Sequence, residues 1–244
     1  LDAELGFDID AWCAAMAKAP KIAFLPNPSN PVGCMMDVAQ FARVLEATPG
    51  STILVVDEAY YEYALHDEDY PDVLAMLAAR QGPWIVLRTF SKAWGLAGLR
   101  VGYGMADSAA FVHLLDKVRS PFNVNLAAQR AALAAWSDPM HMRSGVATTV
   151  ALREALRHEL QALAAPGGPL QGLRIAPSVA NFLFLDIGRS NGPVTEALLR
   201  RGVIIKPWKE PGFEHFLRVS IGTEQDNARF VQALLVAMAE PVAV

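Results

Sequence analysis

The sequence is poor in cysteine and histidine. Its two cysteines, Cys13 and Cys34, stand alone, with neither the spacing of a metal site nor the pairing of a disulfide framework. The five histidines are scattered and form no metal-binding or catalytic pair. We therefore expect no metal site, and the cysteine usage fits the reducing cytoplasm.

Long apolar runs and an excess of positive charge are also absent. No stretch of about 18 apolar residues occurs, and residues 1 to 21 lack the basic start and apolar core of a signal peptide. The net charge of -4 gives no nucleic-acid footprint. With 53% hydrophobic residues the chain can build a large core. We therefore expect small-molecule partners and no nucleic acid or membrane.

In the first half of the chain, apolar runs alternate with helical patterns up to about residue 106. This alternation predicts an α/β fold with a largely parallel sheet. The expected strands are 21–25, 52–56, 84–88 and 100–104, and the expected helices are 8–19, 37–47, 71–80, 107–118 and 125–137.

The second half predicts a smaller α+β unit. Asp138 and Pro139 open a long amphipathic pattern that ends near Ala165, where a Pro/Gly run breaks it. Thr223 and Asp226 form a capping pair for the last helix. The expected strands are 173–176, 181–187, 203–206 and 216–221, with helices at 193–201 and 224–239. We place the domain boundary at the long helix, giving domains 1–137 and 138–244.

A lysine flanked by hydroxyls follows the predicted strand 84–88. Lys92 lies between Thr89 and Ser91 on one side and Arg100, eight residues further on, on the other. An amine nucleophile can form a Schiff base, while hydroxyls and a guanidinium can hold a phosphate. This grouping indicates a pyridoxal phosphate anchor at the C-terminal end of a strand. Taken alone, it is also compatible with a solvated lysine in a Gly-containing turn.

A second cluster, Asp57-Glu58-Ala59-Tyr60, follows the apolar run 52–56. The Asp57 carboxylate can pair with the protonated pyridine nitrogen of such a cofactor. Tyr60 can donate its hydroxyl to the cofactor's phenolic oxygen. The alternative is an aspartate that caps the loop and a tyrosine that packs beneath it.

A third cluster is the Pro/Asn turn 26–33 after the predicted strand 21–25. Three prolines in six residues forbid a helix, and an X-Pro bond here is a candidate for the cis form. Such a turn would direct Asn30 into the sheet crevice as a second partner for the phenolic oxygen. On composition alone, a plain surface turn is the better explanation.

Taken together, these motifs resemble fold-type-I pyridoxal-phosphate-dependent aminotransferases, and within them the histidinol-phosphate aminotransferases. The resemblance rests on Asn-Pro-Val-Gly at 30–33, Asp-Glu-Ala-Tyr at 57–60, Ser-Lys through Leu-Arg at 91–100, and Leu-Arg-Val-Ser-Ile-Gly-Thr at 217–223. It implies the aspartate aminotransferase-like fold, with 1–137 as the C-terminal part of the large cofactor-binding domain and 138–244 as the small domain.

The resemblance also implies a role for each matched residue. Lys92 is the Schiff-base lysine and Asp57 the pyridinium partner, and together with Tyr60 they form the expected catalytic set. Arg218, on a strand-like run, matches the arginine that binds the substrate carboxylate, and a planar guanidinium suits that task. The expected cofactor-binding residues are Asn30, Asp57, Tyr60, Thr89, Ser91, Lys92 and Arg100, and the expected substrate-binding residues are Arg218 and Asn30.

Two further expectations concern substrate and assembly. Lys206 stands where the resemblance predicts an arginine, and it can meet a substrate phosphate as a point charge. The loop 120–123 resembles a family segment near the dimer interface, which predicts a homodimer. The expected reaction is transfer of an amino group from histidinol phosphate or an amino acid to a 2-oxo acid.

The chain begins at Leu1, and the resemblance begins partway through the family's large domain. We therefore expect an N-terminally truncated chain that lacks the family's phosphate-binding turn and ring-stacking aromatic. Two alternatives remain open at this point. One is a pyridoxal-phosphate-dependent decarboxylase of amino-acid phosphates with the same fold, and the other is a catalytically incompetent fragment.

Overall fold

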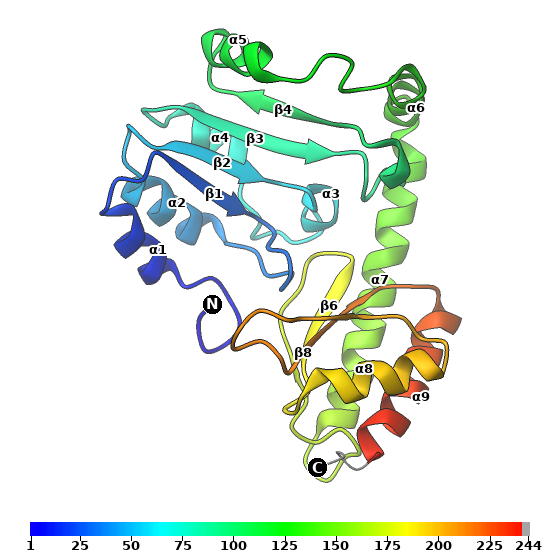
Figure 1. The fold of residues 1–244 in the computed structure, drawn as a ribbon. Coiled ribbons are helices and arrows are strands. Elements are labelled where there is room, and N and C mark those ends of the chain that lie inside the picture. The colour runs from blue at the N-terminus through cyan, green and yellow to red at the C-terminus, as the bar shows by residue number, and fades with distance from the viewer. Residues whose placement is uncertain (241–244) are drawn as a thin grey trace.

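A computed structural model describes residues 1–240 and contains two sheets joined by a long helix (Figure 1). In sheet A the first three strands are parallel and the fourth is antiparallel. Its strands, in spatial order, are β1 (Ile22–Pro26), β2 (Ile53–Asp57), β3 (Trp84–Thr89) and β4 (Gly102–Ala106). The expected α/β fold with a largely parallel sheet is confirmed.

One face of sheet A is covered by helices whose apolar residues pack on the strands. Leu25, Leu54 and Val56 of the strands meet Phe41 and Leu77 of the helices in one core. Asp37 forms a capping box with Gln40 that fixes the start of one of these helices. The covering helices are α1 (Ile9–Met16), α2 (Val38–Ala47) and α4 (Val73–Ala78).

The parallel register places the motifs predicted from the sequence at one end of sheet A. Pro26 pairs with Asp57, and Asp57 pairs with Leu87, so the strands end side by side. A one-turn helix, α3 (Tyr61–Ala64), follows β2, and a 3₁₀ turn, η1 (Ala97–Leu99), lies between β3 and β4. Neither of these short turns was predicted from the sequence.

Sheet B is antiparallel and forms the core of the second unit. Its order is β5-β6-β8-β7, comprising β5 (Arg174–Ile175), β6 (Phe182–Asp186), β8 (Phe216–Ser220) and β7 (Lys206–Pro207). Helices α8 (Asn191–Arg200) and α9 (Glu224–Ala239) pack on it. Thr223 and Asp226 form the predicted capping box at the start of α9.

The prediction of a strand at 203–206 is wrong for residues 203 to 205, because strand pairing begins only at Lys206. The physical reason lies in the preceding helix. Gly202 turns the chain with a φ of 72°, and the Val203 amide bonds back to the Leu198 carbonyl of α8. That amide is therefore used to close the helix, and residues 203 to 205 serve as a connection.

Helix α7 (Pro139–Ala164) bridges the two sheets. Its 26 residues span about 39 Å at 1.5 Å per residue. Asp138 caps its start, as the Asp-Pro pattern predicts. Near one end, Val146 packs with Tyr60, and near the other, Leu156 and Leu160 join the sheet B core. The domain boundary near residue 138 stays a prediction.

Two helices connect sheet A to α7. They are α5 (Ala109–Val118) and α6 (Leu126–Trp136), which follow β4. Both cysteines are free. Among the described residues, every helix is too short or too polar to cross a bilayer.

Candidate active site

The turn after β1 brings Asn30 against sheet B. The Asn27-Pro28 peptide is cis, as expected for an X-Pro bond of this turn. Gly33 has a φ of 96°, and a Cβ there would lie 2.2 Å from Ser178 Oγ, so only glycine fits this close approach. The Gly33 carbonyl accepts from the Val179 amide at 2.9 Å. The Asn-Pro-Val-Gly motif thus docks the first strand end onto the second unit.

Asn30 and Arg218 meet across the two units. Arg218 Nη1 donates to Asn30 Oδ1 at 2.5 Å. The Arg218 guanidinium carbon also lies 5.0 Å from the Phe182 ring centroid and 5.8 Å from that of Trp208. No carboxylate of residues 1–240 forms an ion pair with this guanidinium. It therefore presents a positive charge that is oriented but not neutralised.

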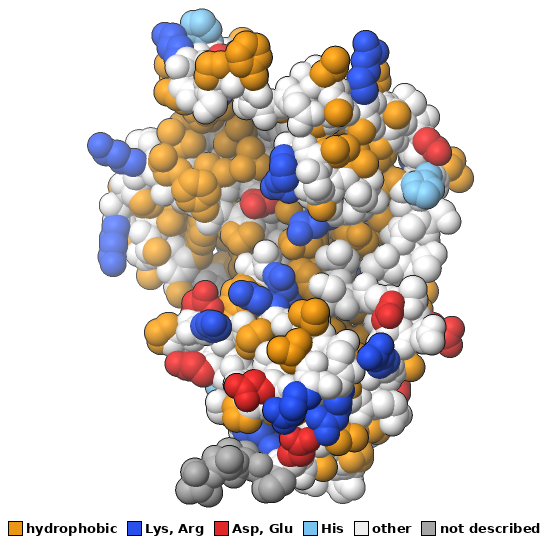
Figure 2. All heavy atoms as spheres, turned by 45° about the vertical axis from the view of Figure 1, so that its right-hand side comes forward, with side chains coloured by type: hydrophobic (Ala, Val, Ile, Leu, Met, Phe, Trp, Pro, Cys, Tyr) orange, Lys and Arg blue, Asp and Glu red, His pale blue; other side chains and the backbone are white. Residues whose placement is uncertain are grey.

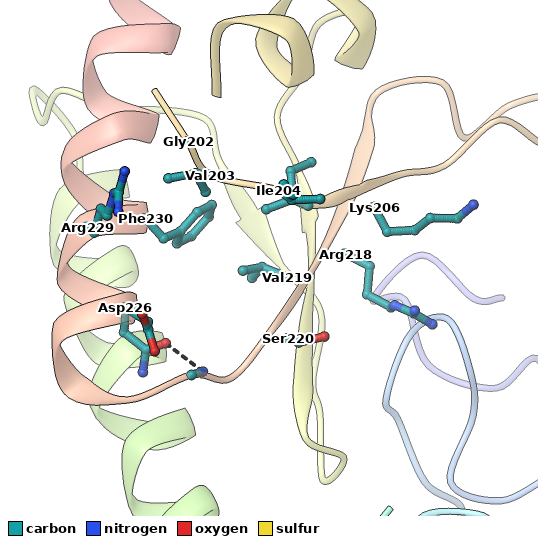
Figure 3. Close-up of a pocket in the computed structure, with 13 residues that line it drawn as sticks. Gly202, Val203, Ile204, Lys206, Arg218, Val219, Ser220, Asp226, Arg229 and Phe230 are labelled. Carbon is teal, nitrogen blue, oxygen red and sulfur yellow. Dashed lines mark hydrogen bonds between the residues drawn. The ribbon is translucent and has the colours of Figure 1, made fainter. Parts of the chain in front are cut away.

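Lys206 lies beside Arg218. The two residues are register partners on β7 and β8, and their side chains extend in the same direction, toward the blue N-terminal ribbon (Figure 3). They line one end of a cavity of about 500 Å³. Two cations on neighbouring strands create a place for an anionic group.

Lys92 and Tyr60 approach each other at the strand ends of sheet A. The Lys92 ammonium lies 5.2 Å from the centroid of the Tyr60 ring. Tyr60 is buried and packs edge-on against Phe182 at 5.3 Å between ring centroids. Phe182 therefore contacts both Tyr60 and Arg218, and it links the lysine side of the site to the arginine side.

Thr89 and Ser91 form a hydroxyl pair immediately before the lysine. Thr89 Oγ1 lies 2.8 Å from Ser91 Oγ and accepts from the Ser91 amide at 3.0 Å. Both side chains are half-buried and lie side by side, so the two hydroxyls can form hydrogen bonds with the same bound group.

Arg100 follows in a strained conformation. Its φ is 55°, in the left-handed region, and its Nη1 donates to the Ala97 carbonyl at 2.7 Å. Within residues 1–240 it forms no hydrogen bond with Thr89 or Ser91. Left-handed backbone at a non-glycine residue costs about 1 kcal/mol or more and concentrates at functional sites.

Asp57 lies exposed at the end of β2. Its Oδ1 accepts from the Ala59 amide at 3.0 Å, which fixes the carboxylate at the head of the turn. Within residues 1–240 it forms no ion pair, and it forms no hydrogen bond with Lys92 or Asn30. The structure therefore places Asp57 at the same sheet end as Lys92 while leaving its carboxylate available.

A buried network behind Asp57 ties the three strand ends together. Glu58 is fully buried, and its carboxylate accepts from Arg88 Nε at 2.8 Å. The Tyr70 hydroxyl lies 2.8 Å from Glu58 Oε1 and 2.7 Å from the Asn27 carbonyl oxygen. Burial raises the pKa of Glu58 above its usual range, and the Arg88 guanidinium opposes that rise.

Sequence reasoning missed Phe182, Arg88 and Tyr70. Phe182 stands in an apolar run whose members look alike in sequence, and only the pairing with β8 shows which ones face the site. Arg88 is separated from its partner Glu58 by 30 residues, so no local spacing signals the pair.

Comparisons with known proteins agree with this arrangement. The family model described as aminotransferase class I and II matches residues 2–234. Histidinol-phosphate aminotransferase 3 of Rhizobium meliloti (strain 1021) is 46% identical over 231 residues, which cover 95% of this chain and 60% of the relative. Histidinol-phosphate aminotransferase 2 of Caulobacter vibrioides is 41% identical over 97% of this chain and 59% of the relative. The chain thus spans about 60% of the length of the curated relatives it matches.

Solved structures share the fold. The histidinol-phosphate aminotransferase of Sinorhizobium meliloti in complex with pyridoxal-5'-phosphate superposes with a TM-score of 0.82 at 27% identity, covering 97% of this chain and 62% of that one. L-threonine-O-3-phosphate decarboxylase from Porphyromonas gingivalis has a TM-score of 0.71 at 23% identity, which shows the fold alone. The match over residues 2–234 establishes that the chain belongs to the class I and II aminotransferase family.

Proposed function

We propose that this chain forms part of a pyridoxal-phosphate-dependent aminotransferase that acts on histidinol phosphate or a related amino substrate. The observation that carries the proposal is the convergence of Lys92 and Tyr60 from sheet A with Arg218 and Phe182 from sheet B. The similarity to named histidinol-phosphate aminotransferases at 41 to 46% identity supports the substrate class.

The donor set fits pyridoxal phosphate. Lys92 would hold the aldehyde. Its ammonium forms no hydrogen bond or ion pair within residues 1–240. The Thr89 and Ser91 hydroxyls, 2.8 Å apart, would donate to the phosphate together with Arg100. Asp57, with a carboxylate free of ion pairs, would face the pyridine nitrogen.

The remaining residues would orient the reacting groups. Asn30 and Tyr60 would donate to the phenolic oxygen, and Arg218 would release Asn30 in part to bind an anionic group of the substrate. Bound pyridoxal phosphate supplies an electron-withdrawing ring and an aldehyde that carries the amino group. With cofactor and substrate bound, Lys92 Nζ would take and return the substrate α-proton.

Lys206 would help to bind the phosphate of the substrate. It neighbours Arg218 across β7 and β8, and the two side chains point the same way. A phosphate carries up to two negative charges, so a pair of cations matches it better than a single arginine does.

We also propose an oligomeric state, a cellular location and a domain boundary for the protein. Phe122, in the loop 120–123, is 99% exposed, which supports the expected homodimer contact at this loop. We further propose a cytoplasmic location and a boundary between domains near residue 138.

The test is an amino-transfer assay on the whole protein. Histidinol phosphate and 2-oxoglutarate should yield glutamate, and Lys92→Ala should abolish its formation. Lys117→Ala, an exposed lysine on α5, is the matched control and should leave turnover unchanged. In a parallel assay with an amino-acid phosphate, which unlike histidinol phosphate carries a carboxylate, release of carbon dioxide without glutamate would favour the decarboxylase alternative. Full turnover in Lys92→Ala would refute the proposal.

A further inference from the structure

A second cavity lies apart from the proposed cofactor site. It occupies about 320 Å³ between α3, the β3-β4 pair and the helices α6 and α7. None of the residues proposed above to hold cofactor or substrate lines it. Its volume falls at the lower end of the range typical of small-molecule sites, about 300 to 1,000 Å³.

Aromatic rings form much of the wall. Trp94 and Trp136 stack with centroids 5.4 Å apart at an interplanar angle of 20°, and Tyr103 meets Trp136 edge-on at 5.9 Å. The Trp136 side of the wall is open, because this residue is 53% exposed. Aromatic faces carry partial negative charge and attract cations, most strongly when water is excluded.

A buried carboxylate lies in the same cavity. Glu62 of α3 is 8% exposed, and Trp94 Nε1 donates to its Oε1 at 2.8 Å. No lysine, arginine or histidine among residues 1–240 lies within ion-pair distance of it. Burial raises the pKa of Glu62, and the hydrogen bond from Trp94 and the more distant charge of Arg88 oppose this rise only in part.

The cations nearby form no ion pair with Glu62. Arg88 donates from its Nε to Glu58 at 2.8 Å, and its guanidinium lies 3.4 Å over the Tyr61 ring, so its charge acts on Glu62 only from a distance. Arg143 and His66 line the mouth of the cavity but are exposed, so solvent screens them. Among the ionisable side chains that line this cavity, Glu62 is therefore the buried one that forms no ion pair within residues 1–240.

We propose that this cavity binds a small organic ammonium ion, whose charge pairs with Glu62 while its apolar body lies against Trp94, Tyr103 and Trp136. The ligand supplies the cation that the protein does not, and the aromatic wall replaces the water that the ion loses. Lys92 does not line this cavity.

Choline and 3,3-dimethylbutan-1-ol provide the test, because they have the same shape and differ in the charge of the central atom. Choline is a quaternary ammonium and cannot condense with an aldehyde, so its binding does not report on the cofactor site. Isothermal titration calorimetry of the protein at pH 8 should show choline binding at least about tenfold tighter than the alcohol, which corresponds to about 1.4 kcal/mol.

Three variants locate the site. Glu62→Gln keeps the shape and removes the charge, and it should weaken choline binding about tenfold while leaving the weak alcohol binding unchanged. Trp136→Leu, at the open side of the wall, should also weaken choline binding. Glu159→Gln, an exposed glutamate on α7, is the matched control and should bind as the unmodified protein does.

A pH series gives an independent readout. Choline keeps its charge at all pH values, so its affinity should rise as Glu62 ionises and should not rise in Glu62→Gln. If Glu62→Gln fails to fold by circular dichroism, Trp136→Leu and the pH series of the unmodified protein decide. Absence of choline binding at millimolar concentration, equal affinity for choline and the alcohol, or full choline affinity in Glu62→Gln or Trp136→Leu would each overturn the proposal.

Discussion

The two halves of the molecule differ in how fully their apolar residues are covered. In sheet B all five residues of β6 are buried, and α9 contributes six buried residues. In the sheet A half, α5 has no buried residue, Phe24 of β1 is 70% exposed, and Phe122 is 99% exposed. Apolar side chains accordingly gather over the upper part of the surface in Figure 2.

Sheet A has a buried core on the face covered by helices, but sheet B is the more fully covered of the two sheets. Most of the residues proposed to act on cofactor lie at the strand ends of sheet A. Arg218 is the group that sheet B contributes, and Phe182 connects the halves by contacting both Arg218 and Tyr60. We infer that substitutions in sheet B mainly change folding and that those at the strand ends of sheet A mainly change activity.

The largest contrast should come from two phenylalanines. Phe184 of β6 is fully buried and stacks on Phe216 at 4.6 Å, so Phe184→Ala should lower the free energy of unfolding by about 3 to 5 kcal/mol. Phe122→Ala should change it by less than about 0.5 kcal/mol. Urea denaturation of both variants would measure the difference, and similar losses would contradict the contrast between the halves.

Asp57→Asn should produce the converse pattern. Turnover of the whole enzyme should fall by about 10² to 10³, because an amide cannot stabilise a cationic ring as a carboxylate does. Asp57 is exposed and accepts a single backbone hydrogen bond, so the unfolding midpoint should stay nearly constant. Steady-state kinetics beside a thermal melt would test this, and near-normal turnover would remove Asp57 from the proposed mechanism.

Glu62 gives the sheet A half a distinctive pH dependence. Burial raises its pKa in the folded state, so the folded protein holds the proton more tightly than the unfolded chain, in which the pKa is about 4.3. The stability that this proton contributes is present at acid pH and is lost as the pH rises through the raised pKa. Relative to the unmodified protein, Glu62→Gln should therefore melt a few degrees higher at pH 8 and similarly at pH 4. A constant difference across this range would argue against the raised pKa.

A smaller effect is expected at the start of α9. Thr223→Ala removes the capping box with Asp226 and should cost about 1 kcal/mol. Thr223→Ser retains the hydroxyl and serves as the control. If both variants lost the same stability, the cap would not be the cause.

Sequence patterns correctly predicted the helices and strands whose limits are marked by apolar runs or capping residues. The three strands of sheet A that end in motifs were predicted within one residue, as were α2, α6 and α7, because apolar runs and capping residues bound them. Strand 203–206 failed because a helix-closing hydrogen bond takes the Val203 amide, and a short apolar run cannot reveal that competition.

From the sequence, the site could be predicted only as a group of residues that follow the ends of neighbouring strands. Register brings Asn30, Asp57 and Lys92 to one edge of sheet A, which follows from parallel strands. The partner of Asn30 is Arg218, 188 residues away, and the contact depends on how the two units pack. Long-range pairs such as Arg88 with Glu58 likewise depend on strand order, which local sequence does not encode.

Chemical trapping of the cofactor tests the central claim most directly. The protein is mixed with pyridoxal phosphate and reduced with borohydride, and the labelled peptide is identified by mass spectrometry, with Lys92→Ala treated in parallel. Labelling should fall on Lys92 and disappear in the variant. Labelling of Lys117 or Lys206 instead, or equal labelling in Lys92→Ala, would contradict the assignment of Lys92 as the cofactor anchor.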